Sequence, residues 1–355
     1  MKIEQIDKNF ILNRGCVEEG VRYYKIPHSA FALYGVFYDE KLGKFRRMES
    51  AAAKATGKSV DYLADHTSGG RLRFSTDSKK FVLRVAYDCL EAMSHMTLEG
   101  QGGFILLEET KRGTRLVKTF PPTFADQKGY TVSVDLSGGM RNYILYFPLY
   151  NAVHSLEIGL DEKATVGEGK RYREVKPIVY YGSSITQGGS ASRPDNCYQA
   201  LISKWNNVDY INLGFSGCAR GEEAIAEYLP TIESSLFVCD YDYNANTPED
   251  LERTHYRLYE RYRAVRPDTP ILFISRPNFK GAKEDKRREE IIRSTYERAK
   301  AQGDNNVYFL AGKTFFGSDK ENCTVDGCHP NDLGFYRMAK KIYAKMKEID
   351  AICSK

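Results

Sequence analysis

A serine, a histidine and an aspartate stand in two loops that could form a site for nucleophilic catalysis. Ser184 lies in the segment GSSITQG, whereas Asp326 and His329 lie in DGCHPND, near the other end of the chain. A serine hydroxyl is a weak nucleophile at neutral pH, so it needs a base and an acid that orients the base. Asp326 precedes His329 by three residues, close enough to hold its imidazole ring. These residues predict acyl transfer through a Ser-His-Asp triad.

Acyl transfer also needs hydrogen-bond donors for the oxyanion that develops in the transition state. Candidate donors are the backbone N–H groups of Ser184 and of Gly217 in NLGFSG, together with the side-chain amide of Asn244 in DYDYNAN. The missing side chain of Gly217 would let its backbone approach the reacting carbonyl group. Asn246 is the alternative to Asn244. We favour Asn244 because it lies closer to the preceding apolar run.

Each of these residues also has a structural interpretation. Ser184 could cap a helix, His329 could belong to a capped turn before Pro330, and Asp326-Gly327 is a turn signal by itself. The glycine loop around Ser184 could bind phosphate, but the pattern GxxxxGK[ST] is absent. Four polar loops follow successive apolar runs in the order that a catalytic site would require. This arrangement favours the catalytic interpretation over the structural one.

The other reactive side chains favour structural roles. Cys323 and Cys328 flank Asp326, but no second Cys or His pair completes a zinc site. Cys197 and Cys218 lie near the candidate loops, but a thiol nucleophile would need its own base. We therefore expect neither a metal ion nor an organic cofactor.

Two arginines follow the candidate loops. Arg220 and Arg276 could bind an anionic substrate, and a surface or capping role is equally open.

A parallel sheet would position these loops. After residue 177, short apolar runs alternate with segments of helical period. The runs cover residues 178–181, 210–213, 236–239, 271–274 and 307–310, and the helical segments cover 196–204, 222–228, 248–265 and 283–302. This alternation predicts a parallel sheet with helices on both faces, and active groups gather at the carboxyl ends of such strands.

The first part of the chain follows a different pattern, with apolar residues at every second position. Leu72 and Phe74 alternate with polar residues, and the alternation resumes at Phe81 after a turn. Many short strands with almost no helical period predict an antiparallel β-sandwich of the jelly-roll type. A polar segment around residue 170 favours a boundary, so we predict domains at residues 1–170 and 171–355.

The composition is that of an ordinary globular protein. The 355 residues include 42% hydrophobic and 28% charged side chains, with a formal net charge of +5. Both signs of charge are interspersed, which argues against a nucleic-acid partner. We find no signal-peptide pattern and no run of eighteen apolar residues. We therefore expect no membrane partner and a cytoplasmic location, unless a signal peptide has been removed, and we leave the oligomeric state open.

The four candidate loops resemble the signature blocks of a known enzyme family. GSSIT, NLGFSG, the asparagine after the third apolar run and DGCHPND are similar to the four blocks of the SGNH (GDSL-type) hydrolases, over roughly residues 176–350. The resemblance implies a flavodoxin-like three-layer α/β/α fold. The segments SGGRLRFSTDS and LYFPLYNAVHSLEIGL resemble the β-rich domain that precedes the hydrolase domain in a bacterial two-domain branch of this family.

By this resemblance, the site residues take the roles assigned above: Ser184 nucleophile, Gly217 and Asn244 oxyanion donors, Asp326 orienting acid and His329 base. The sequence departs from the family pattern in two places. Ser183 replaces the usual Asp before the nucleophile, which removes a supporting carboxylate. The third block lacks the usual Gly-x-Asn-Asp, which weakens the placement of its asparagine.

The expected function is that of a serine esterase acting on a small-molecule or glycan ester. In the family resembled, β-sandwich attachments often accompany sugar deacetylases, so we favour a carbohydrate O-deacetylase. A lipid- or thioester-directed acylhydrolase and an acyltransferase with the same triad are alternatives. In the competing class, the chain is a non-enzymatic carbohydrate-binding protein with an inactive hydrolase-like domain.

Overall fold

The apolar runs after residue 177 form one parallel sheet. The computed structural model describes residues 5–7, 13–15, 19–277 and 280–349. The sheet has five strands: β14 (Ile178–Gly182), β15 (Tyr210–Gly214), β16 (Leu236–Asp240), β17 (Ile271–Ile274) and β18 (Val307–Leu310). Their order is β15-β14-β16-β17-β18, with all neighbours parallel. This is the flavodoxin-like order 2-1-3-4-5, so the predicted fold is confirmed.

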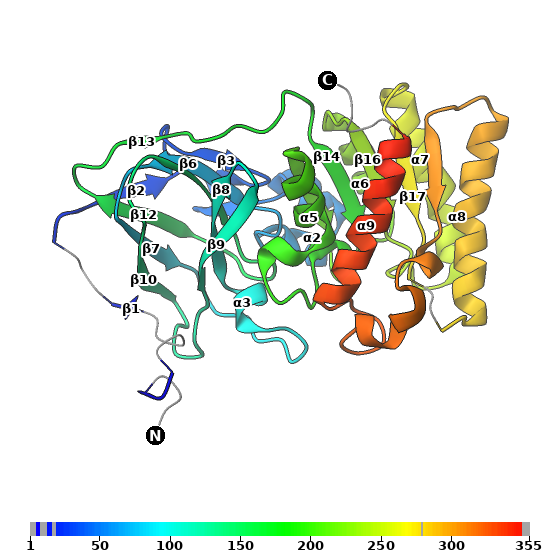
Figure 1. Ribbon diagram of the computed structural model, residues 1–355. Coiled ribbons are helices and arrows are strands. Elements are labelled where there is room, and N and C mark those ends of the chain that lie inside the picture. Colours follow the sequence, from blue (N-terminus) through cyan, green and yellow to red (C-terminus); the bar gives the residue numbers. More distant parts are fainter. Residues whose placement is uncertain (1–4, 8–12, 16–18, 278–279, 350–355) are drawn as a thin grey trace.

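Helices cover both faces of this sheet (Figure 1). They are α4 (Ser184–Gln187), α5 (Tyr198–Asn206), α6 (Glu223–Tyr228), α7 (Pro248–Val265), α8 (Lys283–Ala301) and α9 (Asp332–Glu348). Short 3₁₀ helices lie between them: η3 (Pro194–Asn196), η4 (Leu229–Thr231), η5 (Gly312–Thr314) and η6 (Gly317–Cys323). Helices α5 and α9 pack on one face, whereas α6, α7 and α8 cover the other. No helix of the described residues is both long enough and apolar enough to span a bilayer.

Most strands before residue 170 form two antiparallel sheets. The first has the order β1 (Asn13–Arg14), β10 (Gly129–Asp135), β7 (Lys80–Ala86), β12 (Ser155–Asp161), β2 (Val21–Ile26). The second has the order β13 (Val166–Gly167), β6 (Arg71–Thr76), β11 (Arg141–Tyr146), β8 (Phe104–Thr110), β9 (Gly113–Phe120), and β3 (Ala32–Tyr34) pairs with β6. The Phe81 ring of the first sheet stacks on Phe74 and Phe120 of the second, with centroids 6.0 and 5.6 Å away. The predicted β-sandwich is therefore confirmed.

The polar face of strand β6 is buried as well, because it packs against the α/β region. Arg71 is 0% exposed and Arg73 is 2% exposed. Arg71 forms an ion pair with Asp209, and its guanidinium carbon lies 3.7 Å from the centroid of the Tyr210 ring. Alternation of apolar and polar residues is typical of a strand with one solvent-exposed face. In β6, the polar face instead forms the junction between the two regions.

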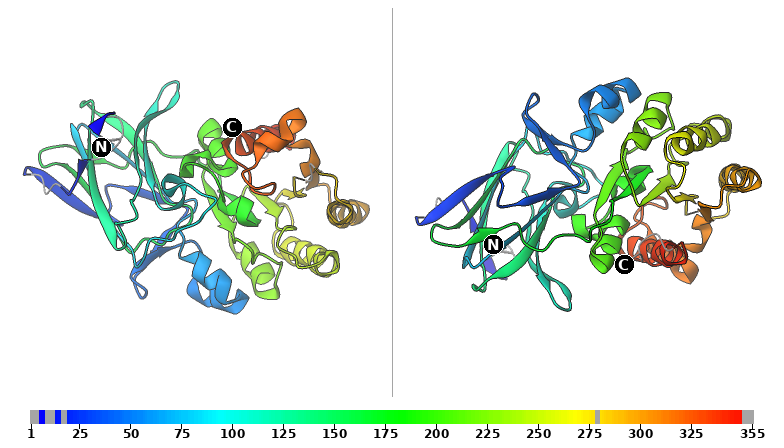
Figure 2. Two further views of the ribbon diagram at one scale, coloured as in Figure 1. Left: turned by 90° about the horizontal axis from the view of Figure 1, so that it is seen from below. Right: turned by 90° about the horizontal axis from the view of Figure 1, so that it is seen from above.

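Three short helices occur where the sequence pattern predicted almost none, and one of them is α3 (Leu98–Gln101). After the β4 (Phe37–Asp39) and β5 (Lys44–Arg46) hairpin, the chain forms α1 (Ser50–Thr56) and α2 (Lys58–Ala64). Each has 7 residues, too short to establish a helical period in the sequence. They leave the sandwich and pack over the parallel sheet, with α1 against α6 (Figure 2). The prediction of an almost helix-free first region is therefore wrong for this segment.

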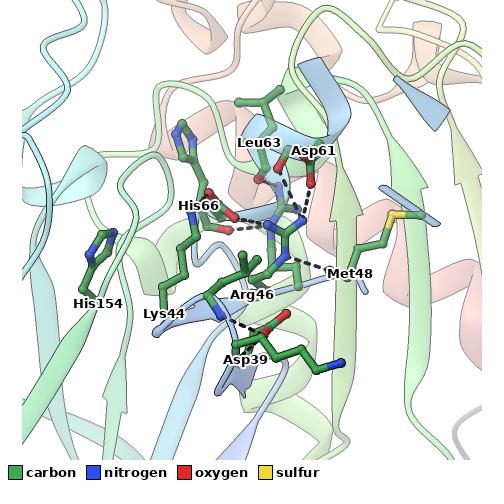
Figure 3. A network of polar contacts seen from close by, with 12 residues as sticks. Asp39, Lys44, Arg46, Met48, Asp61, Leu63, His66 and His154 are labelled. Atoms are coloured by element: carbon green, nitrogen blue, oxygen red, sulfur yellow. Dashed lines mark hydrogen bonds and ion pairs between the residues drawn. The ribbon is translucent and has the colours of Figure 1, made fainter. Parts of the chain in front are cut away.

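Helix α2 is held to the preceding hairpin by a buried arginine (Figure 3). Arg46 donates to the Asp61 carboxylate at 2.7 Å and to the Met48 carbonyl oxygen at 3.2 Å. Asp65 accepts hydrogen bonds from both Arg46 and Lys44. Since Arg46 is 2% exposed, these partners compensate the cost of burying its charge.

The two regions share part of their hydrophobic core. Met48, Val60 and Leu63 join the same buried cluster as Leu213 of β15 and Ile225 of α6. The domain boundary near residue 170 stays a prediction. This packing makes us expect that the two regions unfold together.

Met48→Ala tests this expectation. The Met48 side chain is fully buried, so its truncation should lower the free energy of unfolding by about 2–5 kcal/mol. The chain has 1 Trp, and Trp205 in α5 reports on the α/β region. Urea titration followed by Trp205 fluorescence and by far-ultraviolet circular dichroism should show the same shifted midpoint.

The matched control is Met140→Ala, since Met140 is 55% exposed and should change stability by less than about 0.5 kcal/mol. In Met48→Ala, the circular dichroism transition could shift while the Trp205 transition stays at the wild-type midpoint. This result would contradict joint unfolding.

Candidate active site

Ser184 lies at the carboxyl end of the central strand β14. The preceding Ser183 caps helix α4, since its hydroxyl accepts the N–H of Ile185 at 3.2 Å. The capping role considered for Ser184 therefore belongs to Ser183. Ser184 is the first residue of α4, and backbone N–H groups of a first helical turn have no acceptor within the helix. Its hydroxyl and its N–H are both available at the edge of the sheet.

The structure brings His329 and Asp326 to this serine. The Nε2 atom of His329 lies 2.9 Å from the Ser184 hydroxyl oxygen, and its Nδ1 atom lies 2.7 Å from an Asp326 carboxylate oxygen. A carboxylate only accepts hydrogen bonds, so Nδ1 carries the proton and the lone pair of Nε2 faces Ser184. The three residues form a continuous hydrogen-bonded chain.

The Asp-x-x-His spacing has a local physical basis. The second carboxylate oxygen of Asp326 accepts the backbone N–H groups of Cys328 and His329 at 2.9 and 2.7 Å. Burial alone would raise the pKa of Asp326, but these bonds and the His329 side chain lower it to about 2. Asp326 therefore stays ionised at neutral pH, and the loop that holds it also aims the imidazole ring.

The loop after β15 lies beside the serine and carries Gly217. The φ angle of Gly217 is +72°, a conformation that favours glycine, and a Cβ atom added there would meet no atom within 4 Å. Glycine is thus needed here for the backbone conformation. Asn244 donates its amide to the carbonyl oxygen of Phe215 in this loop at 2.9 Å, whereas Asn246 is exposed in the following turn.

Helix α4 and the Gly217 loop are joined by hydrogen bonds. Gln187 accepts the N–H of Ser216 at 2.9 Å, and Asn212 donates to the carbonyl oxygen of Thr186 at 2.7 Å. These bonds fix the position of the Gly217 loop relative to Ser184.

Two residues of the first region complete the surroundings, and neither was predicted from the sequence. Arg47 donates to the carbonyl oxygens of Asn212 and Gly214 at 2.8 Å each, at the base of the Gly217 loop. The Tyr150 hydroxyl donates to the carbonyl oxygen of Ser184 at 3.2 Å. Tyr150 belongs to the quoted segment LYFPLYN, but only its position in space reveals the contact.

The other candidates are two cysteines and two arginines. The cysteines have a protonation state unsuited to nucleophilic attack, and the arginines bind other groups of the protein. Burial raises the pKa values of the Cys197 and Cys218 thiols to about 11, which disfavours the reactive thiolate. Arg276 forms an ion pair with Asp285, and Arg220 donates to the carbonyl oxygen of Gly217 at 3.2 Å.

The fold and this site define the class of protein: an ester hydrolase built on a flavodoxin-like sheet. Residues 175–347 match the GDSL-like lipase/acylhydrolase family, and residues 21–166 match the N-terminal region of SGNH hydrolase-type esterases. The chain belongs to the SGNH/GDSL-type hydrolases with this N-terminal region, as the resemblance predicted.

Solved structures share the whole architecture. A GDSL-like lipase from Bacteroides ovatus is 29% identical with a TM-score of 0.82, over 94% of this chain and 98% of that chain. A salicylyl-acyltransferase from a tetracycline biosynthetic pathway is 19% identical with a TM-score of 0.77, over 94% and 98%. An acetyl xylan esterase from the rumen bacterium Butyrivibrio proteoclasticus is 12% identical with a TM-score of 0.58, over 92% and 98%. No curated protein sequence matches the chain.

The hydrogen-bonded chain at Ser184 generates a labelling prediction. A fluorophosphonate phosphonylates an activated serine, so the wild-type protein should gain the mass of one phosphonyl group. Ser184→Ala and His329→Ala should gain none, because they lack the nucleophile and the base. Intact mass spectrometry measures the result, and full labelling of folded Ser184→Ala would refute the assignment of the nucleophile.

The different positions of Asn244 and Asn246 generate a second prediction. Asn244→Ala should lower kcat for an ester about 10²–10³-fold, the usual effect of removing one oxyanion donor. Asn246→Ala is the matched control and should keep kcat near the wild-type value. The reverse pattern in steady-state kinetics would move the oxyanion role to Asn246.

Proposed function

We propose that this protein is a serine esterase in which Ser184, His329 and Asp326 act as a catalytic triad. The observation that carries the proposal is the hydrogen-bonded chain from the serine hydroxyl through the imidazole to the carboxylate, at 2.9 and 2.7 Å. Ser184 attacks the ester carbonyl carbon while its proton moves to Nε2 of His329. The imidazolium then protonates the leaving alcohol, and water releases the acyl group by the reverse sequence.

The oxyanion of each tetrahedral intermediate is stabilised by the N–H groups of Ser184 and Gly217 and by the Asn244 amide. Asp326 stays ionised and stabilises the imidazolium through its bond to Nδ1. The substrate that we favour is a carbohydrate O-acetyl ester, as the family resemblance implies. We keep this proposal because structural neighbours include carbohydrate esterases, among them the acetyl xylan esterase.

The size of a hollow next to the site also supports a small, soluble ester. A hollow of about 480 Å³ lies beside the Gly217 loop, is lined in part by Ser216 and Tyr150, and is open to solvent. An open hollow of this size suits a sugar-sized alcohol, whereas a long acyl chain requires an extended apolar groove.

An acyl-chain series tests the substrate proposal. With 4-nitrophenyl esters of two to twelve carbons, kcat/KM should be highest for acetate and fall at least tenfold by eight carbons. Acetylated sugars should release acetate, measured enzymatically, with Ser184→Ala as the inactive control.

Two outcomes would redirect the assignment. A maximum above eight carbons would contradict the deacetylase proposal in favour of a lipid-directed enzyme. Transfer of the acyl group to a sugar hydroxyl in preference to water, seen by mass spectrometry of the products, would indicate an acyltransferase.

A further inference from the structure

The hollow beside the Gly217 loop is built mainly by the first region of the chain. Its lining residues from that region are Lys58, Ser59, Tyr62, Leu63, His66, Met93 and Tyr150, and the α/β region contributes Ser216. Helix α2, which the sequence pattern did not predict, therefore forms one wall. The volume of about 480 Å³ falls within the range typical of small-molecule sites.

The inner end of the hollow reaches Tyr150, which contacts the backbone of the catalytic serine. The buried Tyr150 hydroxyl bonds to the carbonyl oxygen of Ser184 and to the side chain of Ser216. A Cβ atom added to Gly189 would lie 3.0 Å from this hydroxyl and 3.3 Å from the His329 ring, so Tyr150 and the imidazole are near neighbours. Tyr150 therefore links the lining of the hollow to the backbone of Ser184 and to the neighbourhood of the imidazole ring.

An aromatic row leads outward from this end. The Tyr150 ring centroid is 6.0 Å from that of His66, and His66 is 5.1 Å from Tyr62 in an edge-to-face arrangement. Burial and the charge of Arg47 lower the pKa of His66 to about 3, so its ring is neutral near pH 7. Tyr150 and His66 are buried, so the ring that the row presents to a ligand is that of Tyr62.

Tyr62, the outer member of this aromatic row, is exposed and held in place by hydrogen bonding. Tyr62 is 53% exposed, and its hydroxyl donates a hydrogen bond to the Glu91 carboxylate. The backbone N–H of Glu91 is bound by Asn151 at 3.0 Å, and that of Met93 by Gln101 at 3.0 Å. Tyr62 is thus a solvent-facing ring whose orientation is fixed before any ligand binds.

We propose that this hollow binds the alcohol part of the substrate and that its ligand is a pyranose ring stacked on Tyr62. The apolar C–H face of a pyranose packs against an aromatic face, while its hydroxyl groups need polar partners. Tyr62 and Met93 supply the apolar surface, and Ser59 and Lys58 supply the polar groups. An acetyl group is too small to fill the hollow. This inference rests on the proposed esterase function and assigns the choice of alcohol to the first region.

The test compares two acetate esters that differ in the alcohol. One is 6-O-acetyl methyl glucopyranoside, which carries the ring, and the other is ethyl acetate, which carries none. Tyr62→Ala should lower kcat/KM for the glucoside about 10- to 100-fold, the usual range for losing a well-placed aromatic anchor. It should leave kcat/KM for ethyl acetate within twofold, and Tyr62→Phe should keep most of the glucoside activity.

The control variant is Tyr336→Ala, which removes a tyrosine of similar exposure, 45%, from helix α9. It should leave both activities unchanged. Met93→Ala should repeat the selective loss for the glucoside.

Three outcomes would overturn the proposal. Wild-type activity of Tyr62→Ala on the glucoside would show that no pyranose stacks there. Equal losses on both esters would show that Tyr62 only maintains the site. A wild-type protein that hydrolyses neither ester and takes up no fluorophosphonate would refute the esterase function itself, which separates that failure from the other two.

Discussion

The buried guanidinium of Arg47 is the interaction on which the arrangement of the two regions and the site depends. Arg47 is 3% exposed and donates to four backbone carbonyl oxygens, those of His66, Leu63, Asn212 and Gly214, at 2.6–2.8 Å. Burying an arginine without partners would be very costly, so this geometry is strongly constrained. Burial lowers the pKa of Arg47 to about 9, and the residue is still charged at neutral pH.

Arg47 and these four acceptors connect three parts of the molecule: the segment after β5, the end of α2 with the turn after it, and the end of β15. Leu63 and His66 belong to the end of helix α2 and the turn after it, whereas Asn212 and Gly214 lie at the end of strand β15. The Gly217 loop starts from that strand end, and the Arg47 side chain also lies over the Phe215 ring at 4.9 Å. The same contact that docks the first region therefore shapes the loop that holds a candidate oxyanion donor.

The shared construction gives the first region direct contacts with the candidate site. Tyr150 contacts the backbone of the candidate nucleophile, and the residues of α2 form the wall of the neighbouring hollow. The proposed triad lies wholly on the α/β region, whereas the hollow is built mainly by the first region. Our proposals therefore assign the chemical step and the choice of alcohol to different parts of the chain.

The sequence by itself determined the elements whose signals are local. Period-two and helical patterns specified the sandwich strands and the five parallel strands. The Asp-x-x-His pair was readable because Asp326 organises its own loop through backbone bonds within three residues. Ser184, Gly217 and Asn244 were predicted as site residues because each follows an apolar run expected to be a strand of one parallel sheet, whose carboxyl ends share an edge.

Only the tertiary structure decided which polar side chains would be buried and what they would contact. Arg47 and Arg71 look like ordinary surface charges in the sequence, yet both are buried between regions by partners far along the chain. Helices α1 and α2 are too short to show a period, and packing against the parallel sheet stabilises them. Long-range burial has no local pattern, because it depends on which surfaces meet after the chain has folded.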